Sequence, residues 1–304
     1  MDGILAVWKP EGWTSHDVVA KVRRLLKMKR IGHAGTLDPM VTGVLPLCLG
    51  RATRVVEYVQ ERPKSYEAVL QLGIATDTED LTGTVIERQD LITVSEDEVR
   101  RALARFTGEI EQVPPMYSAV KIDGKRLYEL AREGKTVERK SRKVTIHQIE
   151  LLDMQLELEQ PKITFSVVCS KGTYIRTLCV DIGKTLGVPA AMAKLTRTMS
   201  GGITKESCLT LEEIEKLQQT GELSSHLIAA DEAITHLNRA IVPESIGKLA
   251  LMGQKVNLTH SDLDKSLILD GQLVRLYNEN SSFLGIFQID LRAAVLKAVK
   301  VFSA

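Results

Sequence analysis

The chain has 304 residues, of which 44% are hydrophobic, and a formal net charge of +1, and its length predicts one large domain plus a small one. Its four cysteines lack Cys-x-x-Cys pairs and zinc-like spacing with histidine, which excludes a disulfide framework or a structural zinc and predicts reduced thiols. The sequence has no signal-peptide pattern and no apolar run of about 20 residues, so we expect no membrane association and a cytoplasmic location.

The N-terminal region predicts strands and helices in alternation. Ile4–Trp8 is a short apolar strand, and Thr14 or Ser15 can cap the helix that follows. Val44–Leu49 has the pattern of a buried strand, and Thr53–Val59 has that of a helix. The apolar stripe of the first helix is formed by Val18, Val19, Val22, Leu25 and Leu26.

One acid stands in a long cationic stretch of this region. Between Asp17 and Glu57 the only carboxylate is Asp38, whereas the interval holds eight cations: Lys21, Arg23, Arg24, Lys27, Lys29, Arg30, Arg51 and Arg54. Nearby cations favour the charged form of a carboxylate, and an ionised aspartate can act as a nucleophile or a base. The cations could also bind a polyanion, so the pairing indicates chemistry on a nucleic acid.

The backbone around Asp38 predicts a shaped loop. Gly32, Gly35 and Gly43 permit positive φ and the close approach of another backbone. Pro39 favours an extended conformation at Asp38 and disfavours a helix there. A lone Asp-Pro pair is more often an ordinary turn, but the longer string of glycines and prolines is much rarer. We therefore expect a rigid turn that presents Asp38.

The middle of the chain mixes strands and helices without a regular βαβ alternation. Apolar residues alternate along Tyr66–Leu72, as in a half-buried strand. Ser95 with Glu98 forms a capping box for a helix through Phe106, and Arg126–Glu133 predicts a further helix.

Two β-rich runs follow within residues 142–169, on either side of Pro161. A helix then ends at Gly187, with one apolar face formed by Ile175, Leu178, Ile182 and Leu186. The mixture predicts an α+β fold with a largely antiparallel sheet.

Charge is unevenly distributed along the chain. Residues 76–115 hold ten acids and four bases, whereas residues 121–150 hold nine bases and five acids. Such segregation leaves room for a basic face on a nearly neutral protein. For residues 121–150 alone, an ordinary solvated surface remains an equal alternative.

The character of the sequence changes around Asn238–Glu244, and we divide the chain into domains at residues 1–237 and 238–304. The second part alternates short apolar runs with polar turns, which is typical of a small β-rich module. Its runs are Lys255–Leu258, Ser266–Leu269, Leu273–Tyr277, Phe283–Ile289 and Val295–Phe302. An appendage that only packs on the first domain stays open as an alternative to an RNA-binding module.

Several segments resemble the TruB-type tRNA pseudouridine synthases. The string from Gly32 to Pro46 carries the resemblance, and further segments resemble those of the family in the same order: Lys9–Ser15, Tyr66–Gly83, Pro114–Tyr128 and Cys169–Thr177. The C-terminal module resembles a PUA-type domain through Gly253–Val256 and Phe283–Ile286. The resemblance implies a pseudouridine synthase fold, with a mixed, largely antiparallel sheet flanked by helices, plus a small C-terminal β-rich PUA-like domain.

The resemblance also implies roles for individual residues. Asp38 is implied to be the catalytic aspartate; whether it attacks the ribose or the base, or removes a ribose proton, stays open. Arg176 is implied to pair with Asp38, which would be a charge-assisted and geometrically firm interaction. Lys9 is a structural or an RNA-facing cation. The residues implied to hold the substrate or line its pocket are His33, Tyr66, Tyr174, Arg176 and Leu195.

The implied reaction is the isomerisation of one uridine, at position 55 in the T loop of tRNA, to pseudouridine after base flipping. It needs no cofactor and no metal, and we expect a monomer that binds the T stem-loop without an obligate protein partner or guide RNA. Two other functions stay open. The chain could assist tRNA folding with the same surface and without Asp38, or it could be the catalytic subunit of a guide-RNA particle.

Overall fold

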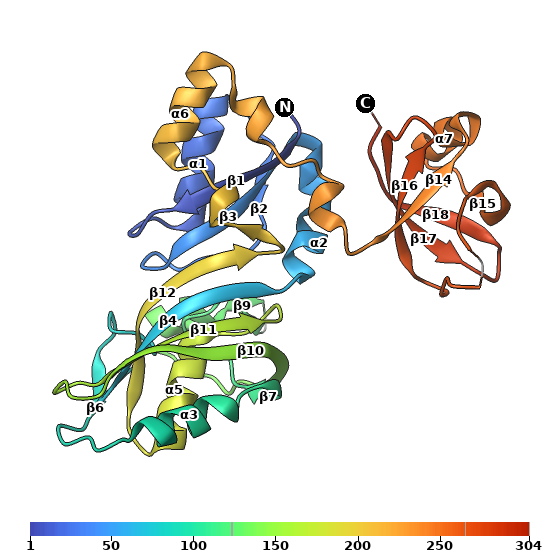
Figure 1. Ribbon diagram of the computed structural model, residues 1–304. Coiled ribbons are helices and arrows are strands. Elements are labelled where there is room, and N and C mark those ends of the chain that lie inside the picture. Colours follow the sequence, from blue (N-terminus) through green and yellow to red (C-terminus); the bar gives the residue numbers. More distant parts are fainter. Residues whose placement is uncertain (123, 265, 304) are drawn as a thin grey trace.

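The computed structural model describes residues 1–122, 124–264 and 266–303, and two β-sheets organise them (Figure 1). The larger sheet has nine strands, and the smaller one belongs to the C-terminal module. The larger sheet runs in the order β1 (Gly3–Lys9), β3 (Thr42–Leu49), β12 (Ala190–Ser200), β4 (Lys64–Leu72), β11 (Lys162–Cys169), β10 (Arg142–Gln155) and β7 (Gly108–Gln112), with β2 (Ile31–His33) on β3 and β13 (Ile203–Thr204) on β12.

Helices flank this sheet at both ends of its strand order. At the end formed by β1 and β3, α1 (Ser15–Leu26) packs with α6 (Leu211–Thr220). α5 (Ile175–Leu186) packs on β12 in the middle of the sheet, and α3 (Glu96–Ala104) packs on α5 and on β10 toward the other end (Figure 1). Among the described strand pairs of the larger sheet, β12 with β3 is the one parallel pair, so the predicted α+β fold with a mixed, largely antiparallel sheet is confirmed.

Local sequence signals explain where several helices begin and end. Thr14 rather than Ser15 caps α1, because the Thr14 hydroxyl accepts from the backbone of Asp17, whose carboxylate accepts in return. Ser95 and Glu98 make the predicted capping box of α3, although the helix ends at Ala104 and not at Phe106. Gly187, with φ of +71°, ends α5 as predicted.

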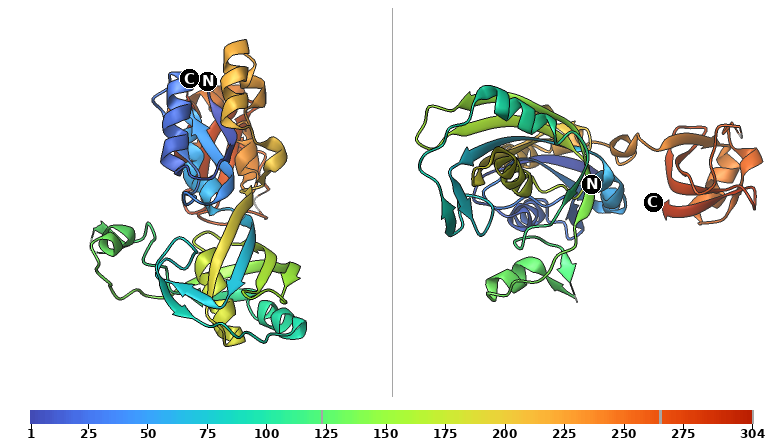
Figure 2. Two further views of the ribbon diagram at one scale, coloured as in Figure 1. Left: turned by 90° about the vertical axis from the view of Figure 1, so that its left-hand side faces the viewer. Right: turned by 90° about the horizontal axis from the view of Figure 1, so that it is seen from below.

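Other predicted helices are shorter than expected. The helix predicted over Thr53–Val59 is a 3₁₀ turn, η1 (Gly50–Val55), followed by α2 (Val56–Glu61). The helix predicted over Arg126–Glu133 is α4 (Leu127–Arg132). It follows the short strands β8 (Lys121–Ile122) and β9 (Lys125–Arg126), and these three elements project from the rest of the molecule (Figure 2).

The sequence analysis missed β12, which lies in the middle of the larger sheet between β3 and β4. Its pairing with β4 is interrupted by two bulges, between Met192 and Lys194 and between Arg197 and Met199. Bulges shift side chains from one face to the other, so the alternation of apolar and polar residues that marks a strand is absent from this sequence.

Gly43 explains how β12 can approach β3. Its φ is +117°, and a Cβ atom there would lie 2.2 Å from the carbonyl oxygen of Arg197 and 2.7 Å from its nitrogen. A side chain at this position is therefore excluded both by backbone conformation and by space. Gly32, by contrast, has no positive φ and would meet only the side chain of Val56 at 3.7 Å.

The C-terminal module is β-rich, as predicted, with β14 and α7 as additional elements that were not predicted. Its sheet has the order β14, β16, β17, β18 and β15. The predicted strand over Ser266–Leu269 is wrong: the carboxylate of Asp264 accepts from the nitrogen and hydroxyl of Ser266 and forms a turn. The bounds are β14 (Asn238–Val242), α7 (Glu244–Leu251), β15 (Val256–Asn257), β16 (Leu273–Asn278), β17 (Phe283–Asp290) and β18 (Val295–Val301).

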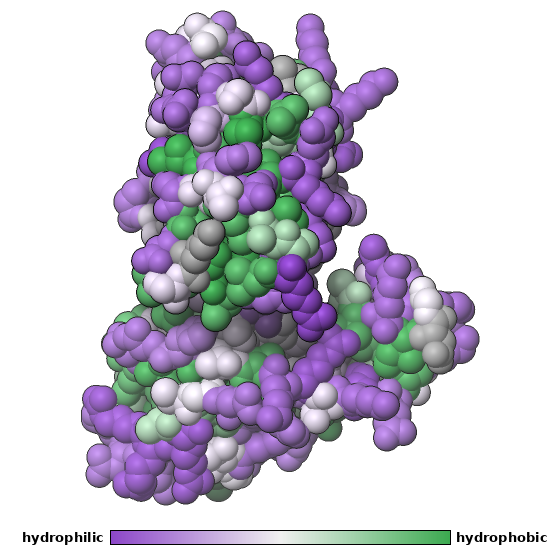
Figure 3. Space-filling model, turned by 90° about the vertical axis from the view of Figure 1, so that its right-hand side faces the viewer, coloured by the Kyte–Doolittle hydropathy of each residue, from purple (hydrophilic) through white to green (hydrophobic). Residues whose placement is uncertain are grey.

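The module has a core of its own and also touches the larger part. Ile286 packs into a second cluster with Ile4 and Val55 of the larger part, and Lys300 pairs with Glu57 at 2.9 Å. Figure 3 views the molecule from the side on which the module lies in Figure 1, and shows hydrophobic side chains among hydrophilic ones there. The exposed apolar side chains of the module include Leu249, Met252, Leu267 and Leu269.

The remaining elements are short. The hairpin of β5 (Ile74–Thr76) and β6 (Val85–Arg88) follows β4, and 3₁₀ turns connect the later elements. None of the helices in the described part of the chain is long and apolar enough to cross a bilayer. The 3₁₀ turns are η2 (Lys205–Ser207), η3 (Leu223–His226), η4 (Glu232–Ile234) and η5 (Leu258–His260).

Candidate active site

The loop that carries Asp38 is fixed on both sides of this residue. On one side, the buried hydroxyl of Ser15 accepts from the nitrogen of Leu37 at 2.8 Å and donates to its carbonyl oxygen at 3.2 Å. On the other side, the nitrogen of Gly12 donates to the carbonyl oxygen of Pro39 at 2.9 Å. Asp38 itself lies between these anchors, in a segment without regular secondary structure, so the loop is shaped by the start of α1 and the segment before it.

Lys9 lies under the same loop as a structural cation. It is fully buried, and its ammonium donates to three carbonyl oxygens, those of Pro10, Trp13 and Pro39. Burial lowers the pKa of Lys9 from 10.5 to about 8, while the nearby carboxylate of Asp38 acts in the opposite direction. The side chain joins β1 to the residue after Asp38, so of its two predicted roles the structure favours the structural one.

Arg176 reaches Asp38 from the first turn of α5. One of its nitrogens lies 3.0 Å from the Asp38 carboxylate. The guanidinium also donates to the carbonyl oxygens of Thr78 at 3.0 Å and Tyr117 at 2.8 Å. The Arg176 side chain is only 7% exposed, whereas that of Asp38 is 47% exposed. The carboxylate of Asp80 lies 3.9 Å from the guanidinium as well. A cation held by these groups thus directs the Asp38 carboxylate, which a substrate can reach.

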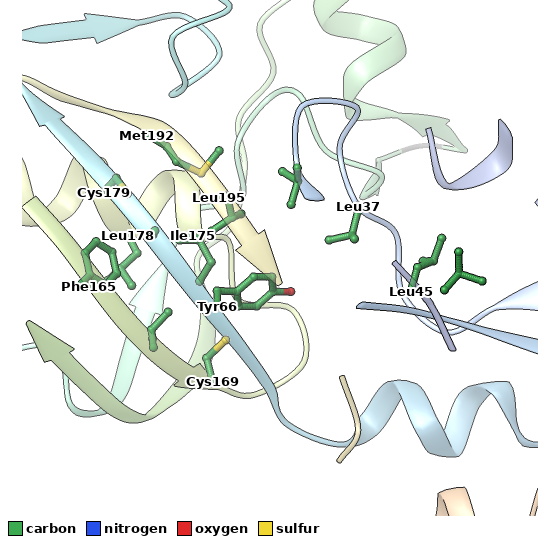
Figure 4. Close-up of a cluster of buried hydrophobic side chains, with 14 of the residues drawn as sticks. Leu37, Leu45, Tyr66, Phe165, Cys169, Ile175, Leu178, Cys179, Met192 and Leu195 are labelled. Atoms are coloured by element: carbon green, nitrogen blue, oxygen red, sulfur yellow. The ribbon is translucent and has the colours of Figure 1, made fainter. Parts of the chain in front are cut away.

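An apolar wall surrounds the ring of Tyr66 (Figure 4), and this phenol lies close enough to Asp38 for the negative charge to raise its pKa. Tyr66 projects from β4 with its hydroxyl toward the side of Leu37, and Leu195 of β12 and Ile175 of α5 lie next to it. All four side chains are at most 9% exposed. Burial raises the pKa of the Tyr66 phenol, and the positive charge of Arg197 opposes that shift.

Arg197 is a buried cation that the sequence analysis did not single out. It is 1% exposed and stands opposite Tyr66 in the pairing of β12 with β4. Its Nε donates to the carbonyl oxygen of Val44 at 2.7 Å and its Nη2 to that of Gly35 at 3.1 Å. One side chain therefore connects β12, β3 and the loop before Asp38.

For His33 and Tyr174, the structure shows contacts with other described residues and not with Asp38 or Arg176. His33 lies on β2, with its ring edge toward that of His16 at a centroid distance of 5.8 Å. Its buried Nδ1 has no hydrogen-bond partner among the described residues, and burial lowers the pKa of His33. Tyr174 is the N-cap of α5, where the side chain of Gln112 bonds both its backbone nitrogen and its carbonyl oxygen.

The sequence analysis did not assign Arg197, Ser15 or Lys64 to the site. Arg197 lies two positions after Leu195, so recognition of β12 as a strand would have placed both side chains on one face. Ser15 was interpreted as a possible helix cap, and its proximity to Leu37 depends on the fold. Lys64, which donates to the carbonyl oxygens of Gln60 and Arg62, precedes Tyr66 on β4.

The described residues contain no group of three or more histidine, cysteine or acidic side chains that could hold a metal ion. All four cysteines are free thiols, as predicted. Those of Cys48, Cys169 and Cys179 are buried, and burial raises the pKa of each.

Comparison with known proteins identifies the family. Residues 23–175 match the model of the TruB family pseudouridylate synthase N-terminal domain, and residues 176–243 match that of the tRNA pseudouridylate synthase B C-terminal domain. The chain belongs to the TruB family of pseudouridylate synthases. The resemblance inferred from the sequence is thereby confirmed, and the protein is an enzyme of the isomerase class.

The relatives of this TruB-family chain are similar over most of its length. A tRNA pseudouridine synthase B from Geobacillus thermodenitrificans is 45% identical over 99% of this chain and 100% of the relative. One from Bacillus licheniformis is 50% identical over 81% of each chain. Among solved structures, a chain of a Cbf5–Nop10–Gar1 complex is 28% identical, with a TM-score of 0.78 over 99% of this chain and 85% of that one. This likeness confirms the predicted pseudouridine synthase fold.

Proposed function

We propose that this TruB-family enzyme isomerises a uridine of tRNA, at position 55 in the T loop, to pseudouridine, with Asp38 as the catalytic residue. The ion pair between Asp38 and Arg176 carries the proposal, since it joins a half-exposed carboxylate to a buried cation, and the charge of that carboxylate acts on the phenol of Tyr66. The tRNA pseudouridine synthases B among the relatives support the choice of tRNA as substrate.

The site suits a reaction on a base taken out of its stack. A flipped uracil requires a pocket with an aromatic or apolar face. Tyr66, which is near enough to Asp38 to feel its charge, and the neighbouring Leu195 provide one. Tyr174, at the start of α5, would line the same pocket. His33, on β2, would contact the RNA loop that the flipped nucleotide leaves.

The chemistry is an exchange of bonds within one nucleotide. The bond from the ribose carbon to N1 of uracil breaks, a bond from the same carbon to C5 forms, the proton of C5 leaves, and N1 gains a proton. Reactants and products have the same atoms and the same oxidation level, so we propose a reaction without cofactor or metal. Asp38 would act on the substrate directly, and Arg176 would hold the Asp38 carboxylate in the required orientation.

We further propose that residues 1–237 form the catalytic domain and residues 238–304 an RNA-binding domain. β14 is the first element of the smaller sheet and begins at Asn238, which supports this division. The enzyme would act as a monomer on the T stem-loop, in the cytoplasm, without a guide RNA or a protein partner.

The test is to map pseudouridine in an unmodified tRNA transcript incubated with the purified chain alone. We expect one new pseudouridine, in the T loop, and none in a matched transcript that carries cytidine at position 55. Pseudouridine at another position would contradict the proposed target. No product at all with a folded protein would contradict independent action and favour a missing RNA or protein partner.

A further inference from the structure

A groove beside the Asp38 loop has no part in the chemistry described above. It is open to solvent, has a volume of about 360 Å³, and is lined by Gly12, Trp13, Asp17, Ala20, Lys21 and Arg24. The last four belong to α1 and are three or four residues apart, so they share one face of the helix. The small side chain of Ala20 leaves space between the indole and the cations.

The groove is joined to the catalytic loop by direct hydrogen bonds. The ammonium of Lys9 donates to the carbonyl oxygens of both Trp13 and Pro39. The nitrogen of Gly12 donates to the carbonyl oxygen of Pro39 at 2.9 Å. Since Pro39 follows Asp38, an RNA strand with its target nucleotide at Asp38 has its neighbouring nucleotides within reach of this groove.

The lining has the chemistry of a nucleotide site. Trp13 packs partly against the core, which fixes the ring while part of its surface lines the groove. Arg24 is exposed and has no ion pair among the described residues, whereas Lys21 pairs with Glu215 at 3.3 Å. Proteins bind unpaired RNA bases by stacking them on aromatic rings and bind the adjoining phosphates with cations.

We propose that this groove is a second nucleotide subsite, which takes a nucleotide adjoining the target uridine with its base on Trp13 and its phosphate at Arg24 and Lys21. The inference rests on the proposed function, because the ligand is the RNA substrate of the same site. Asp17 would fix the orientation of the bound nucleotide. Its carboxylate accepts from the nitrogen and hydroxyl of Thr14 and repels a phosphate from that end of the groove.

Fluorescence provides the first test, because the chain has two tryptophans. A Trp8→Phe variant leaves Trp13 as its sole tryptophan, and an Asp38→Asn substitution in the same protein prevents turnover. We expect the Trp13 emission to be quenched as unmodified tRNA transcript is added, with the same midpoint as binding measured by filter retention. Unchanged emission at saturating tRNA would overturn the subsite.

Variants of the groove provide the second test, in otherwise wild-type enzyme. We expect Trp13→Ala to raise the dissociation constant for tRNA at least fivefold, roughly the effect of one lost stacked base, while kcat at saturating tRNA stays within about twofold. Trp13→Phe keeps a ring and should stay within about twofold of wild type. Arg24→Gln, at an exposed position that cannot disturb the core, should weaken binding about threefold, and Arg101→Gln on α3 is its control.

The outcomes separate this inference from the proposed function. Wild-type affinity in both Trp13→Ala and Arg24→Gln, with pseudouridine still formed in the T loop, would overturn the subsite and leave the function standing. Quenching of Trp13 and weaker binding by the variants, without formation of pseudouridine by wild-type enzyme, would support the subsite and overturn the function.

Discussion

Two groups of cations differ in their burial, and the protein uses them in opposite ways. Lys9, Lys64 and Arg197 are at most 7% exposed and donate to backbone carbonyl oxygens. None of the three has a carboxylate within ion-pair distance in the described part of the chain. Arg24 on α1 and Lys29 in the segment that follows this helix, by contrast, are exposed. The buried group shapes the site, whereas the exposed group remains available to a polyanion.

This difference shows why a count of charges is a poor guide to this protein. The net charge of +1 includes cations that an RNA cannot reach. A buried cation is costly unless its hydrogen bonds are satisfied, so each member of the buried group should matter for stability or geometry. Each exposed cation should matter for affinity and its dependence on salt.

The largest effect is expected for Arg197→Met, which leaves the carbonyl oxygens of Val44 and Gly35 without their donor. Each buried acceptor left unpaired costs about 1–3 kcal/mol, so we expect the free energy of unfolding to fall by about 2–6 kcal/mol, measured by thermal unfolding. Arg100→Met on the surface of α3, where Arg100 pairs with Glu96, is the control and should change stability by less than about 1 kcal/mol. An equal effect of the two substitutions would contradict the structural role of Arg197.

Arg176→Lys should affect catalysis more than binding. A lysine keeps the charge but lacks the planar fork that joins Asp38 to the carbonyl oxygens of Thr78 and Tyr117. We expect kcat to fall about 100-fold, as for a catalytic group displaced by about 1 Å, with tRNA affinity within about threefold. Arg100→Lys is the matched control, and unchanged kcat in Arg176→Lys would show that the pair does not position Asp38.

Lys64 should make stability depend on pH. Burial lowers its pKa from 10.5 to about 8, and the charge of Arg197 adds to the shift. Between pH 8 and 10.5 the unfolded chain therefore holds a proton on Lys64 that the folded chain has released. The contribution of this group to the free energy of unfolding thus increases as the pH rises. The stability of wild type relative to Lys64→Met should increase from pH 7.5 to pH 9.5, by about 1 kcal/mol per pH unit at most.

The control for this pH dependence is Lys143→Met. Lys143 lies on the surface of β10, and its hydrogen bond to Glu109 raises its pKa. The contribution of Lys143 to the free energy of unfolding should therefore change little over the same pH range. A wild-type advantage over Lys64→Met that shrinks as the pH rises would mean that Lys64 is not buried as a charged group.

The smallest effect is expected from a single exposed cation. Lys29→Gln should weaken tRNA binding about twofold to threefold and reduce the slope of log K against log salt by about 0.7–0.9, without a change in kcat. Binding titrations at several salt concentrations measure both quantities, with Arg101→Gln on α3 as the control. An unchanged slope would show that this end of α1 does not face the phosphates.

Much of this arrangement could be predicted because its signals are local. The helix cap at Thr14 or Ser15, the capping box at Ser95, the alternation along β4 and the helix stop at Gly187 each depend on a few neighbouring residues, and the structure contains all four, with Thr14 as the cap. The family resemblance led to Asp38 and Arg176, which the fold brings to 3.0 Å although they are far apart in the chain.

The features that were missed depend on contacts between distant segments. β12 has bulges that disturb its alternation, and it is a strand because β3 and β4 border it. The role of Arg197 follows from that placement, since its acceptors lie on Val44 and Gly35. In the C-terminal module, Ser266–Leu269 has strand-like residues, but the hydrogen bonds of Asp264 impose a turn.

The most direct test of the account is to measure, with one Asp38→Asn preparation, both the single-turnover rate of pseudouridine formation and the affinity for tRNA. We predict no pseudouridine above background and an affinity within about tenfold of wild type, because phosphate contacts supply most of the binding. Asp90→Asn, on an exposed acid that pairs with Arg88, should leave both quantities unchanged. If Asp38→Asn also still promotes tRNA folding, the chain has that second activity independently of catalysis. A rate within about tenfold of wild type would contradict the account, since it would mean that Asp38 lowers the activation barrier by less than about 1.4 kcal/mol.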